Sequence, residues 1–217
     1  MTRLADPADF IRENLRLAPV PSVPEISLYT AHSASGLSGL TAPDDDAGPP
    51  YWAYAWGGGI VLARHVLDHP EVAGGRRVLD LGAGGGLVAI AAAKAGAASV
   101  LAAEIDPMGL AAIGVNAEVN GVTVATTGED LLGGPPPRAT DLVLVGDLFY
   151  ERGLARRVTA FLDRCLAAQI EVLVGDPGRT PLPRSRLRTI AEYPTPDFGR
   201  GGDPARPAAV FAFKPLR

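Results

Sequence analysis

Short apolar runs alternate with longer stretches of helical periodicity between residues 77 and 176. The apolar runs are nearly continuous, as in strands that are buried on both faces of a parallel sheet. This alternation predicts a doubly wound α/β fold, whose ligands bind at the carboxyl ends of the strands. Two apolar segments near the C-terminus complete a mostly parallel, seven-stranded, Rossmann-like sheet. The expected strands are residues 77–81, 99–104, 122–126, the run that begins at 141, 170–176, 189–193 and 208–213.

Residues 1–50 are expected to form an N-terminal extension to a main domain at residues 51–217. Asp6 is placed to cap a helix over residues 6–16, and alternating apolar positions then predict a strand over 26–30. Small, acidic and turn-forming residues fill the segment 33–50, which predicts a mobile surface loop. We therefore expect the extension to be an appendage able to cover an active site.

Composition limits the class of protein. A chain of 217 residues that is 47% hydrophobic is long enough for one compact domain with an ample core. No stretch approaches ~20 uninterrupted apolar residues, so we expect a soluble, cytoplasmic protein with no membrane partner. The net charge of −4 argues against nucleic acid as the main partner. Cys165 is the only cysteine, which excludes an intramolecular disulfide and thiolate metal sites, and we expect it to be buried and no metal to be bound.

A glycine cluster follows the first strand of the main domain. Glycines permit positive φ and close approach of backbone N–H groups, and the next helix directs its positive end at a ligand. A dinucleotide fingerprint requires its third glycine where this chain has Leu87. The observed pattern is Asp80-x-Gly82-x-Gly84-x-Gly86. It resembles the first motif of seven-stranded S-adenosylmethionine-dependent methyltransferases, in which the acidic residue lies near the methionine part of the cofactor.

Further positions are candidates for contacts with a nucleotide-like cofactor. Glu104 ends the second strand 22 residues after Gly82, where a carboxylate accepts hydrogen bonds from both ribose hydroxyls; a solvated glutamate at the strand end is the alternative. Asp130 and Leu131 follow the third strand, where they would hold an adenine amino group and pack on its ring; an exposed acidic turn is the alternative. Trp56 belongs to an aromatic cluster beside glycines, which suits either a platform for a cationic ligand or packing in the core.

A second motif, Asp147-Leu148-Phe149-Tyr150, follows the apolar run that begins at residue 141. Methyl transfer requires a nucleophile with a free lone pair, aligned ~3 Å from the methyl group. Asp147 is suited to accept hydrogen bonds from a lysine amine and to stabilise the charge that develops on nitrogen. Tyr150 is suited to pack against the lysine stem or to bond to the amine. The alternative is a helix-capping Asp147 with Tyr150 in the core.

Five segments occur in the order PYWAYAWGGGIVLARHVLDHP, VLDLGAGGG, AAEIDP, LVGDLFYE and VGDPGR. Together they resemble the seven-stranded protein-lysine methyltransferases, and within them the subgroup that acts on the β subunit of electron transfer flavoprotein. The resemblance implies a class I methyltransferase fold, S-adenosyl-L-methionine as cofactor, and electron transfer flavoprotein β as protein substrate. Two features depart from the family. The tail after Arg179 matches no known signature, and Glu104 stands where many relatives carry aspartate.

These arguments name the candidate site residues. The catalytic candidates are Asp147 and Tyr150. The substrate-binding candidates are Phe149 and Arg179, and the resemblance implies that Arg179 borders the substrate entrance. The cofactor-binding candidates are Trp56, Asp80, Gly82, Gly84, Gly86, Glu104, Asp130 and Leu131.

The fold and the cofactor motifs do not select the acceptor. A methyltransferase acting on small molecules or on another protein is therefore a second hypothesis, and a non-catalytic cofactor-binding partner module is a third. Intact Asp147 and Tyr150 argue against the non-catalytic module. Six arginines between Arg179 and Arg206, against three acidic residues, form either a surface for an acidic partner or a solvated loop.

Overall fold

A seven-stranded sheet forms the centre of the structure, a computed structural model that describes residues 6–37, 49–194 and 207–216. The strand order is β5-β4-β3-β6-β7-β9-β8, in which β9 alone runs antiparallel to its neighbours β7 and β8. The reversal of order beside β3 makes the fold doubly wound, as the sequence predicts. The strands are β3 (Arg77–Leu81), β4 (Ser99–Ala103), β5 (Ala125–Thr127), β6 (Leu142–Gly146), β7 (Glu171–Asp176), β8 (Leu187–Pro194) and β9 (Pro207–Phe213).

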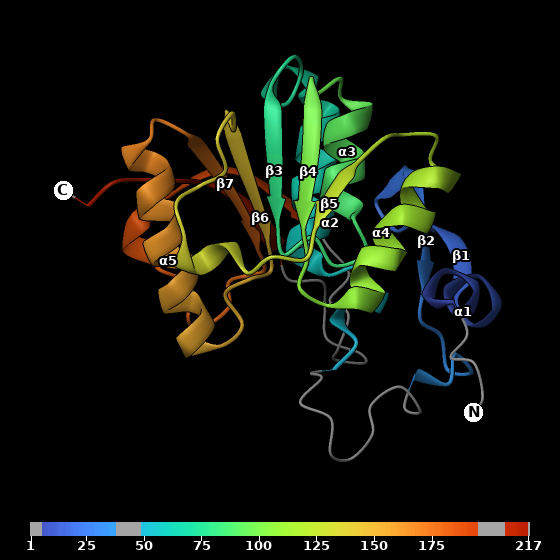
Figure 1. Cartoon of the computed structure of the whole chain (residues 1–217). Helices are drawn as coiled ribbons and strands as arrows, with labels where there is room; N and C mark the ends of the chain where they lie inside the picture. The colour runs from blue at the N-terminus through green and yellow to red at the C-terminus, as the bar shows by residue number, and fades with distance from the viewer. Residues whose placement is uncertain (1–5, 38–48, 195–206, 217) are drawn as a thin grey trace.

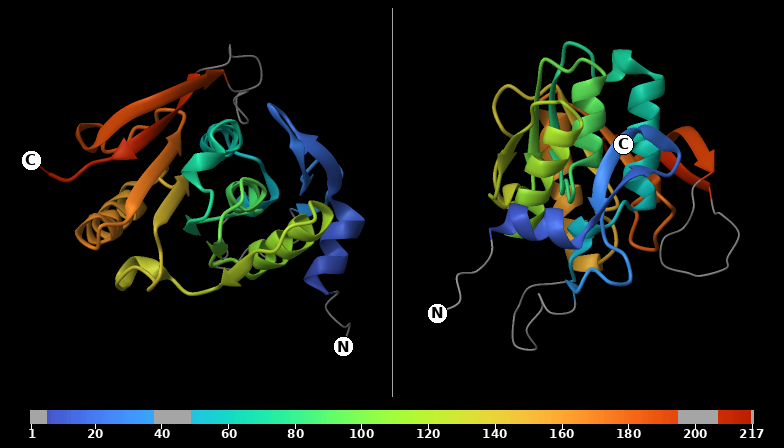
Figure 2. Two further views of the ribbon diagram at one scale, coloured as in Figure 1. Left: turned by 90° about the horizontal axis from the view of Figure 1, so that it is seen from above. Right: turned by 90° about the vertical axis from the view of Figure 1, so that its right-hand side faces the viewer.

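Helices cover both faces of this sheet. Helices α2 and α3 lie side by side on one face, and α5 lies on the other, as the view from above in Figure 2 shows. In Figure 1 the arrowheads of β3 and β4 point to the lower edge of the sheet, which therefore holds the carboxyl ends of the parallel strands. The helices are α1 (Pro7–Asn14), α2 (Gly57–Asp68), α3 (Leu87–Lys94), α4 (Pro107–Val119) and α5 (Arg152–Ala167), with short 3₁₀ turns at Tyr51–Ala53, Pro70–Val72, Leu131–Gly133 and Arg184–Arg186.

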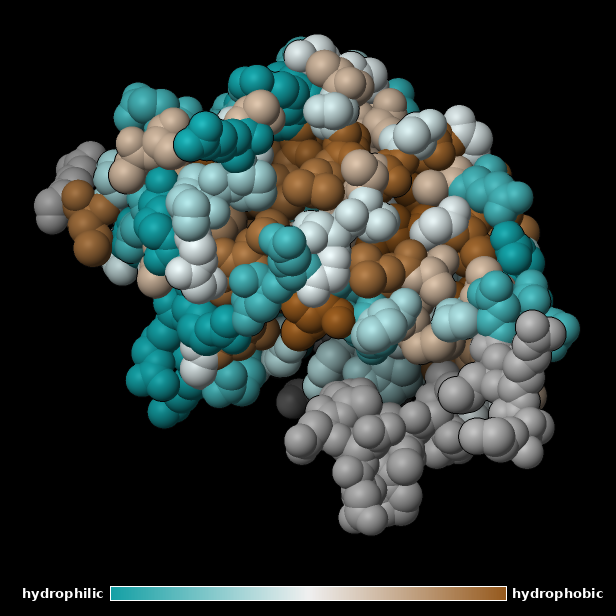
Figure 3. All heavy atoms as spheres, in the orientation of Figure 1, coloured by the Kyte–Doolittle hydropathy of each residue, from teal (hydrophilic) through white to brown (hydrophobic). Residues whose placement is uncertain are grey.

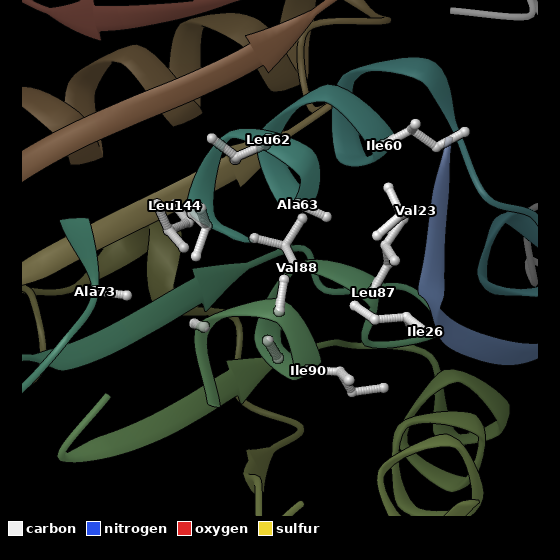
Figure 4. Packing of buried hydrophobic residues seen from close by; sticks show 14 of the residues in the cluster. Val23, Ile26, Ile60, Leu62, Ala63, Ala73, Leu87, Val88, Ile90 and Leu144 are labelled. Carbon is white, nitrogen blue, oxygen red and sulfur yellow. The ribbon is translucent and has the colours of Figure 1, made fainter. Parts of the chain in front are cut away.

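The strands supply two cores, because successive side chains of a strand point to opposite faces. In β6, Leu142 and Leu144 join the core shared with α2 and α3, whereas Val143 and Val145 join the core under α5. Figure 4 shows side chains of the first core, which meet between the sheet, α2 and α3. Both faces of β6 are thus buried, which explains its continuous apolar run.

The described part of the N-terminal extension packs into the main domain. Strands β1 (Arg16–Val20) and β2 (Val23–Thr30) form an antiparallel hairpin. Val23 and Ile26 of β2 point into the core toward α2 and α3 (Figure 4). Helix α1 packs on α4. Among the described residues of the extension, Pro49 lines the cavity at the carboxyl ends of the strands, and the hairpin does not. Residues 38–48 of the expected loop lie outside the described residues, so covering of the site by the extension stays a prediction.

Several elements differ from the predictions: α1 ends at Asn14 and not at residue 16, β1 occupies residues where no strand was predicted, and β2 begins at Val23 and not at residue 26. Helix α2 begins at Gly57, before the apolar run that starts at Ile60, because the Ile60 amide already donates to the carbonyl oxygen of Trp56 (2.9 Å). Glycine is a poor helix former, so the sequence does not reveal this first turn. Strand β5 begins at Ala125 instead of Val122, because the Val122 amide donates to the Ala117 carbonyl and closes the end of α4.

Other sequence-based expectations concern the surface and the lone thiol. Cys165 is fully buried on α5, and burial raises the pKa of its thiol to about 12, so it is a core residue as predicted. None of the described helices is both long and apolar enough to cross a membrane. Within the same residues, no group of three His, Cys, Asp or Glu side chains is arranged to hold a metal ion. Figure 3 shows hydrophobic residues gathered in the middle of one face, between α5 and α4, with hydrophilic residues around them.

Candidate active site

A cavity of about 530 Å³ opens at the carboxyl ends of the parallel strands. It meets the prediction that ligands of this fold bind outside the strand ends at the switch in strand order. The glycine-rich turn after β3, the end of β4, the segment after β5 and the segment after β6 all contribute to its wall. Its lining includes the predicted residues Trp56, Gly82, Gly84, Glu104, Asp130, Leu131, Asp147, Tyr150 and Arg179.

The glycine-rich turn adopts a backbone that side chains disfavour. Gly82, Gly84 and Gly86 have φ values of 70°, 54° and 88°. Gly82 and Gly84 line the cavity, whereas Gly86 lies behind them as the N-terminal cap of α3 and packs against Ile113. A Cβ on Gly82 would come within 2.5 Å of Leu148. The predicted turn is therefore present, with two of its three glycines placed for ligand contact and the third for helix geometry.

Asp80 lies beneath the turn and not on the cavity wall. Its side chain is 1% exposed, and its Oδ2 accepts a 2.8 Å hydrogen bond from the Ala89 amide in the first turn of α3. Burial raises the pKa of Asp80 to about 7. Asp80 thus caps α3 from inside and holds the glycine turn against the helix. Asp80 would therefore act on a bound cofactor by holding the turn, and not by the direct contact that the sequence suggested.

Glu104 ties the end of β4 to the glycine turn. Its Oε2 accepts a 2.8 Å hydrogen bond from the Gly84 amide, and its Oε1 accepts a 2.9 Å bond from the Asp106 amide. Burial raises the pKa of its carboxyl group, partly offset by these two bonds. Each oxygen keeps a lone pair, and the side chain lines the cavity. This donor set suits a diol such as a ribose.

Asp130 and Leu131, from the segment after β5, form a further part of the cavity wall. Asp130 Oδ1 accepts from the Leu132 amide at 3.0 Å, and its other oxygen forms an ion pair with Arg157 of α5. The bond from Arg157 lowers the pKa of Asp130, which is therefore ionised at neutral pH. Leu131 and Leu132 add apolar wall beside it. This end can accept a flat ring that carries an amino group.

Aromatic residues before α2 form a third wall. Trp56 lines the cavity, and its Nε1 donates a 2.9 Å hydrogen bond to the carbonyl oxygen of Tyr51. The rings of Tyr51 and Tyr150 lie 5.3 Å apart, which joins this segment to the second motif. Trp52 is 3% exposed and packs in the core with α1 and α4, although one edge reaches the cavity. Trp52 thus has the core-packing role of the two alternatives, and Trp56 lies where a platform for a ligand would have to lie.

Asp147 occupies a strained, tightly surrounded position after β6. Its backbone is left-handed (φ 56°), and its amide donates to the Gly175 carbonyl at 3.0 Å. Asp147 Oδ2 accepts a 2.9 Å bond from the Gly59 amide at the start of α2. Burial raises the pKa of the carboxyl group, and the charge of Arg179 lowers it in part. A residue held in this backbone region at a strand end is a common sign of a functional site.

The ion pair of Arg179 with Asp147 is a contact that sequence reasoning missed. Nη2 and Nε of Arg179 donate to Asp147 Oδ1 at 2.7 and 3.2 Å. The turn that carries Arg179 is held by Asp176, whose Oδ1 accepts from the Gly178 and Arg179 amides. The other oxygen of Asp176 is buried and has no hydrogen-bond partner among the described residues, and burial raises the pKa of Asp176 to about 6.

The other residues of the second motif point in opposite directions. Tyr150 is 46% exposed at the cavity rim. Phe149 is fully buried in the core under α5. The expected substrate contact of Phe149 is therefore replaced by a packing role, because no part of its ring reaches the surface.

The cavity fits a ligand with a positive charge, a diol and a flat ring. Five carboxylates line it (Glu104, Asp106, Glu129, Asp130 and Asp147), against the two guanidinium groups of Arg157 and Arg179. Aromatic and aliphatic walls stand between the polar ends. S-adenosylmethionine combines these groups, so the residues present fit that cofactor.

Comparisons with known proteins agree with this fold. The family model described as ribosomal protein L11 methyltransferase (PrmA) matches residues 62–145. The solved ribosomal protein L11 methylase of Lactobacillus delbrueckii subsp. bulgaricus is 25% identical, with a TM-score of 0.50 over 70% of this chain and 77% of that chain. TrmN from Thermus thermophilus shares the fold at 22% identity, with a TM-score of 0.53 over 72% of this chain and 48% of that chain. The sheet is thus that of the class I methyltransferases.

Curated relatives extend the match to most of the chain. The electron transfer flavoprotein beta subunit lysine methyltransferase of Xenopus laevis is 36% identical over 88% of this chain and 80% of its own length. The Caenorhabditis elegans homolog of that enzyme is 34% identical over 81% of this chain and 82% of its own length. The Danio rerio relative is 41% identical over 68% of this chain, which spans 59% of that relative's length. The chain therefore belongs to the electron transfer flavoprotein beta subunit lysine methyltransferase family.

Proposed function

We propose that this protein transfers a methyl group from S-adenosylmethionine to lysine side chains of a protein, namely the beta subunit of electron transfer flavoprotein. One observation carries the proposal: Asp147 and Tyr150 open onto the same cavity as the glycine turn and Glu104. The carboxylate that would bind the acceptor amine thus lies in the same cavity as the residues that would bind a nucleotide-like cofactor. The names of the relatives in zebrafish, rat and Xenopus support the choice of protein substrate.

The cofactor side of the cavity is assigned residue by residue. Glu104 accepts hydrogen bonds from the ribose hydroxyls, and the backbone of Gly82 and Gly84 lies close to the methionine part of the cofactor. Asp130 accepts from the adenine amino group, and Leu131 packs on the ring. Trp56 presents its ring to the positive charge. Asp80 and Gly86 contribute by holding the turn and the start of α3.

The acceptor enters beside Tyr150. A shallow groove next to the cavity is lined by Tyr150, Glu151, Arg152, Arg179, Thr180 and Pro181. It shares Tyr150 and Arg179 with the cavity, so a side chain that passes between these two residues reaches Asp147. A lysine is long enough to cross the rim while its main chain stays in the groove outside. A protein substrate is therefore compatible with a cofactor that is bound inside the cavity.

The residues of this chain prepare the acceptor nitrogen. When bound, S-adenosylmethionine supplies a methyl group on a positively charged sulfur. The lysine nitrogen uses its lone pair to form the new bond to carbon, the electron pair of the broken carbon–sulfur bond stays on sulfur, and the nitrogen afterwards releases one proton to water. Asp147 accepts a hydrogen bond from the amine and stabilises the positive charge that develops on it. Tyr150 orients the amine from the rim.

The test is transfer of radiolabel from S-adenosylmethionine. The purified protein should label the beta subunit of electron transfer flavoprotein, and mass spectrometry should place the label on lysine. Asp147→Ala should abolish the label while S-adenosylhomocysteine still binds. Label that appears only in acid-soluble, low-mass material would refute the protein acceptor and favour a small-molecule methyltransferase. Cofactor binding without transfer to any cell fraction would favour a non-catalytic module.

A further inference from the structure

Arg179 neutralises the acid that receives the acceptor. Its guanidinium group donates twice to Asp147 Oδ1, at 2.7 and 3.2 Å, and Asp147 is only 8% exposed. The guanidinium carbon also stands 6.0 Å from the ring of Trp56. The Asp176 carboxylate holds the backbone of Arg179 from the other side. Arg179 is therefore fixed against Asp147 by contacts on three sides.

The ion pair changes the net charge that surrounds the nitrogen of a bound lysine. A lone, buried Asp147 carboxylate would attract a lysine ammonium and raise the pKa of that ammonium. A protonated lysine has no lone pair and cannot accept a methyl group. The Asp147–Arg179 pair carries no net charge, and the Asp147 carboxylate lines the cavity with Oδ2 bonded to backbone amides at the start of α2. A carboxylate has about four acceptor sites, so one remains for a ligand. The pair can therefore accept a hydrogen bond from an amine without favouring the ammonium.

We propose that Arg179 is a positioning residue that acts through Asp147 and holds the bound acceptor lysine as a neutral amine. The inference rests on the proposed function, because it assumes a lysine acceptor. It assigns to Arg179 a role different from the direct substrate contact that the sequence suggested. It also explains why a positively charged residue can stand at the acceptor entrance. The charge of Arg179 is offset by Asp147 and so does not repel a lysine substrate.

Other ionisable groups face this part of the cavity and enter the pH dependence. They are Asp176 from the end of β7, Glu104 from the end of β4, Glu151 beside Tyr150, and the hydroxyl groups of Tyr51 and Tyr150. The pKa of Asp176 is raised to about 6, and burial raises that of Tyr150 above its usual value. Asp80 beneath the glycine turn has a pKa of about 7, and burial raises the pKa of Asp147 and of Glu104 as well. The acceptor amine is therefore identified by the part of the titration that moves when Arg179 is replaced.

The first measurement is the pH profile of kcat at saturating acceptor protein, since kcat reports groups in the bound complex. Arg179→Gln should move the rising limb upward by roughly one to two pH units, so that the rate falls about tenfold or more near neutrality and recovers at high pH. KM should fall as well, because the uncompensated Asp147 binds the ammonium more tightly. Arg179→Lys should keep the original profile, and Arg156→Gln, an exposed arginine of α5, is the control.

The second measurement needs no turnover. Dissociation constants of cationic S-adenosylmethionine and neutral S-adenosylhomocysteine are compared by calorimetry in four proteins. Arg179→Gln should raise the preference for the cation roughly threefold to tenfold, and Asp147→Asn should lower it. The double variant should return to the starting ratio, because it again carries no unpaired charge, and it stands in for Arg179→Gln if the single variant fails to fold.

Each outcome is decisive for one of the two claims. A rate loss in Arg179→Gln that is equal at every pH, or a gain in rate, overturns the role of Arg179. Equal binding ratios in all four proteins overturn it as well. If the ratios of the two dissociation constants change with the charges at positions 147 and 179 but no protein is methylated, the proposed acceptor is wrong and the neutralisation of Asp147 by Arg179 is supported. If neither ligand binds the unmodified protein, the proposed cofactor itself is wrong.

Discussion

The side-chain amide of Asn116 donates a 2.8 Å hydrogen bond to the carbonyl oxygen of Gly85 in the glycine-rich turn. Asn116 is completely buried on α4, and its Oδ1 accepts a 2.9 Å bond from the Tyr29 amide of strand β2. One side chain therefore joins the turn, the helix and the N-terminal hairpin. The extension is coupled in this way to the cofactor side of the cavity, although none of its strands reaches the cavity itself.

Asn116→Ala should weaken both the fold and cofactor binding. It removes the partner of two partly buried backbone groups, for which a loss of about 1–2 kcal/mol in the free energy of unfolding is expected. The freed turn should also lower the affinity for S-adenosylhomocysteine. Urea denaturation and calorimetry measure the two effects. Asn14→Ala is the matched control, since that amide bonds within α1 only. An unchanged affinity in a destabilised protein would contradict the coupling.

Glu104→Gln should reduce cofactor affinity without unfolding the protein. A glutamine has one acceptor oxygen, so its NH₂ group must face either the Gly84 or the Asp106 amide, both of which are donors. The turn is then displaced and the ribose loses a charged acceptor, for which we expect a roughly tenfold or greater rise in Kd. Calorimetry with S-adenosylhomocysteine checks the change against Glu13→Gln on the exposed side of α1. Equal affinities would remove Glu104 from the site.

Asp80→Asn should stabilise the protein at alkaline pH. The folded pKa of Asp80 is raised from 3.8 to about 7, so its contribution to stability is complete below about pH 4 and is lost as pH rises through 7. Asparagine keeps an acceptor for the Ala89 amide and has no charge to bury. The free energy of unfolding of Asp80→Asn, relative to that of the unmodified protein, should rise by roughly 2 kcal/mol from pH 5 to pH 8. Urea denaturation at both pH values tests this, with Asp9→Asn on α1 as control. A constant difference would mean that Asp80 titrates normally.

Gly175→Ala should be among the most damaging small substitutions in the chain. A Cβ there would lie 2.1 Å from the carbonyl oxygen of Gly58, and backbone cannot move aside as a side chain does. We expect a loss of roughly 3 kcal/mol or more, or a failure to fold. Gly114 is an exposed position of α4, where a Cβ would meet no atom within 4 Å. Gly114→Ala should therefore raise the free energy of unfolding by about 0.5–1 kcal/mol. Thermal unfolding of the two variants gives the comparison.

The fold was accessible from the sequence because strand burial leaves a direct pattern. The apolar run of β6 marks that strand, and Pro107 at the first position of α4 with Gly121 just after its end marks that helix, each to within a residue or two. The residues at the strand ends were accessible for the same reason, since a doubly wound sheet places them together. Glu104, Asp147 and Tyr150 accordingly reach one cavity.

Side-chain direction was harder to predict. Alternation along β3 places Asp80 on the same face as Val78, toward α3, and this signal would have identified its inward orientation. No such signal exists for Arg179, because its contact with Asp147 depends on the turn that Asp176 holds after β7. Phe149 was misassigned because the loop after β6 has no repeating period from which burial can be read.

The contact between Gly58 and Gly175 also bears on how this family can vary. A Cβ at either residue would lie within about 2.2 Å of the other's carbonyl oxygen, so the two positions are constrained jointly and neither change can rescue the other. Homologues that keep an acidic residue at position 147 should keep glycine at both positions. A homologue with a larger residue at either one must separate α2 from β7, and its aromatic segment would then serve a differently shaped acceptor.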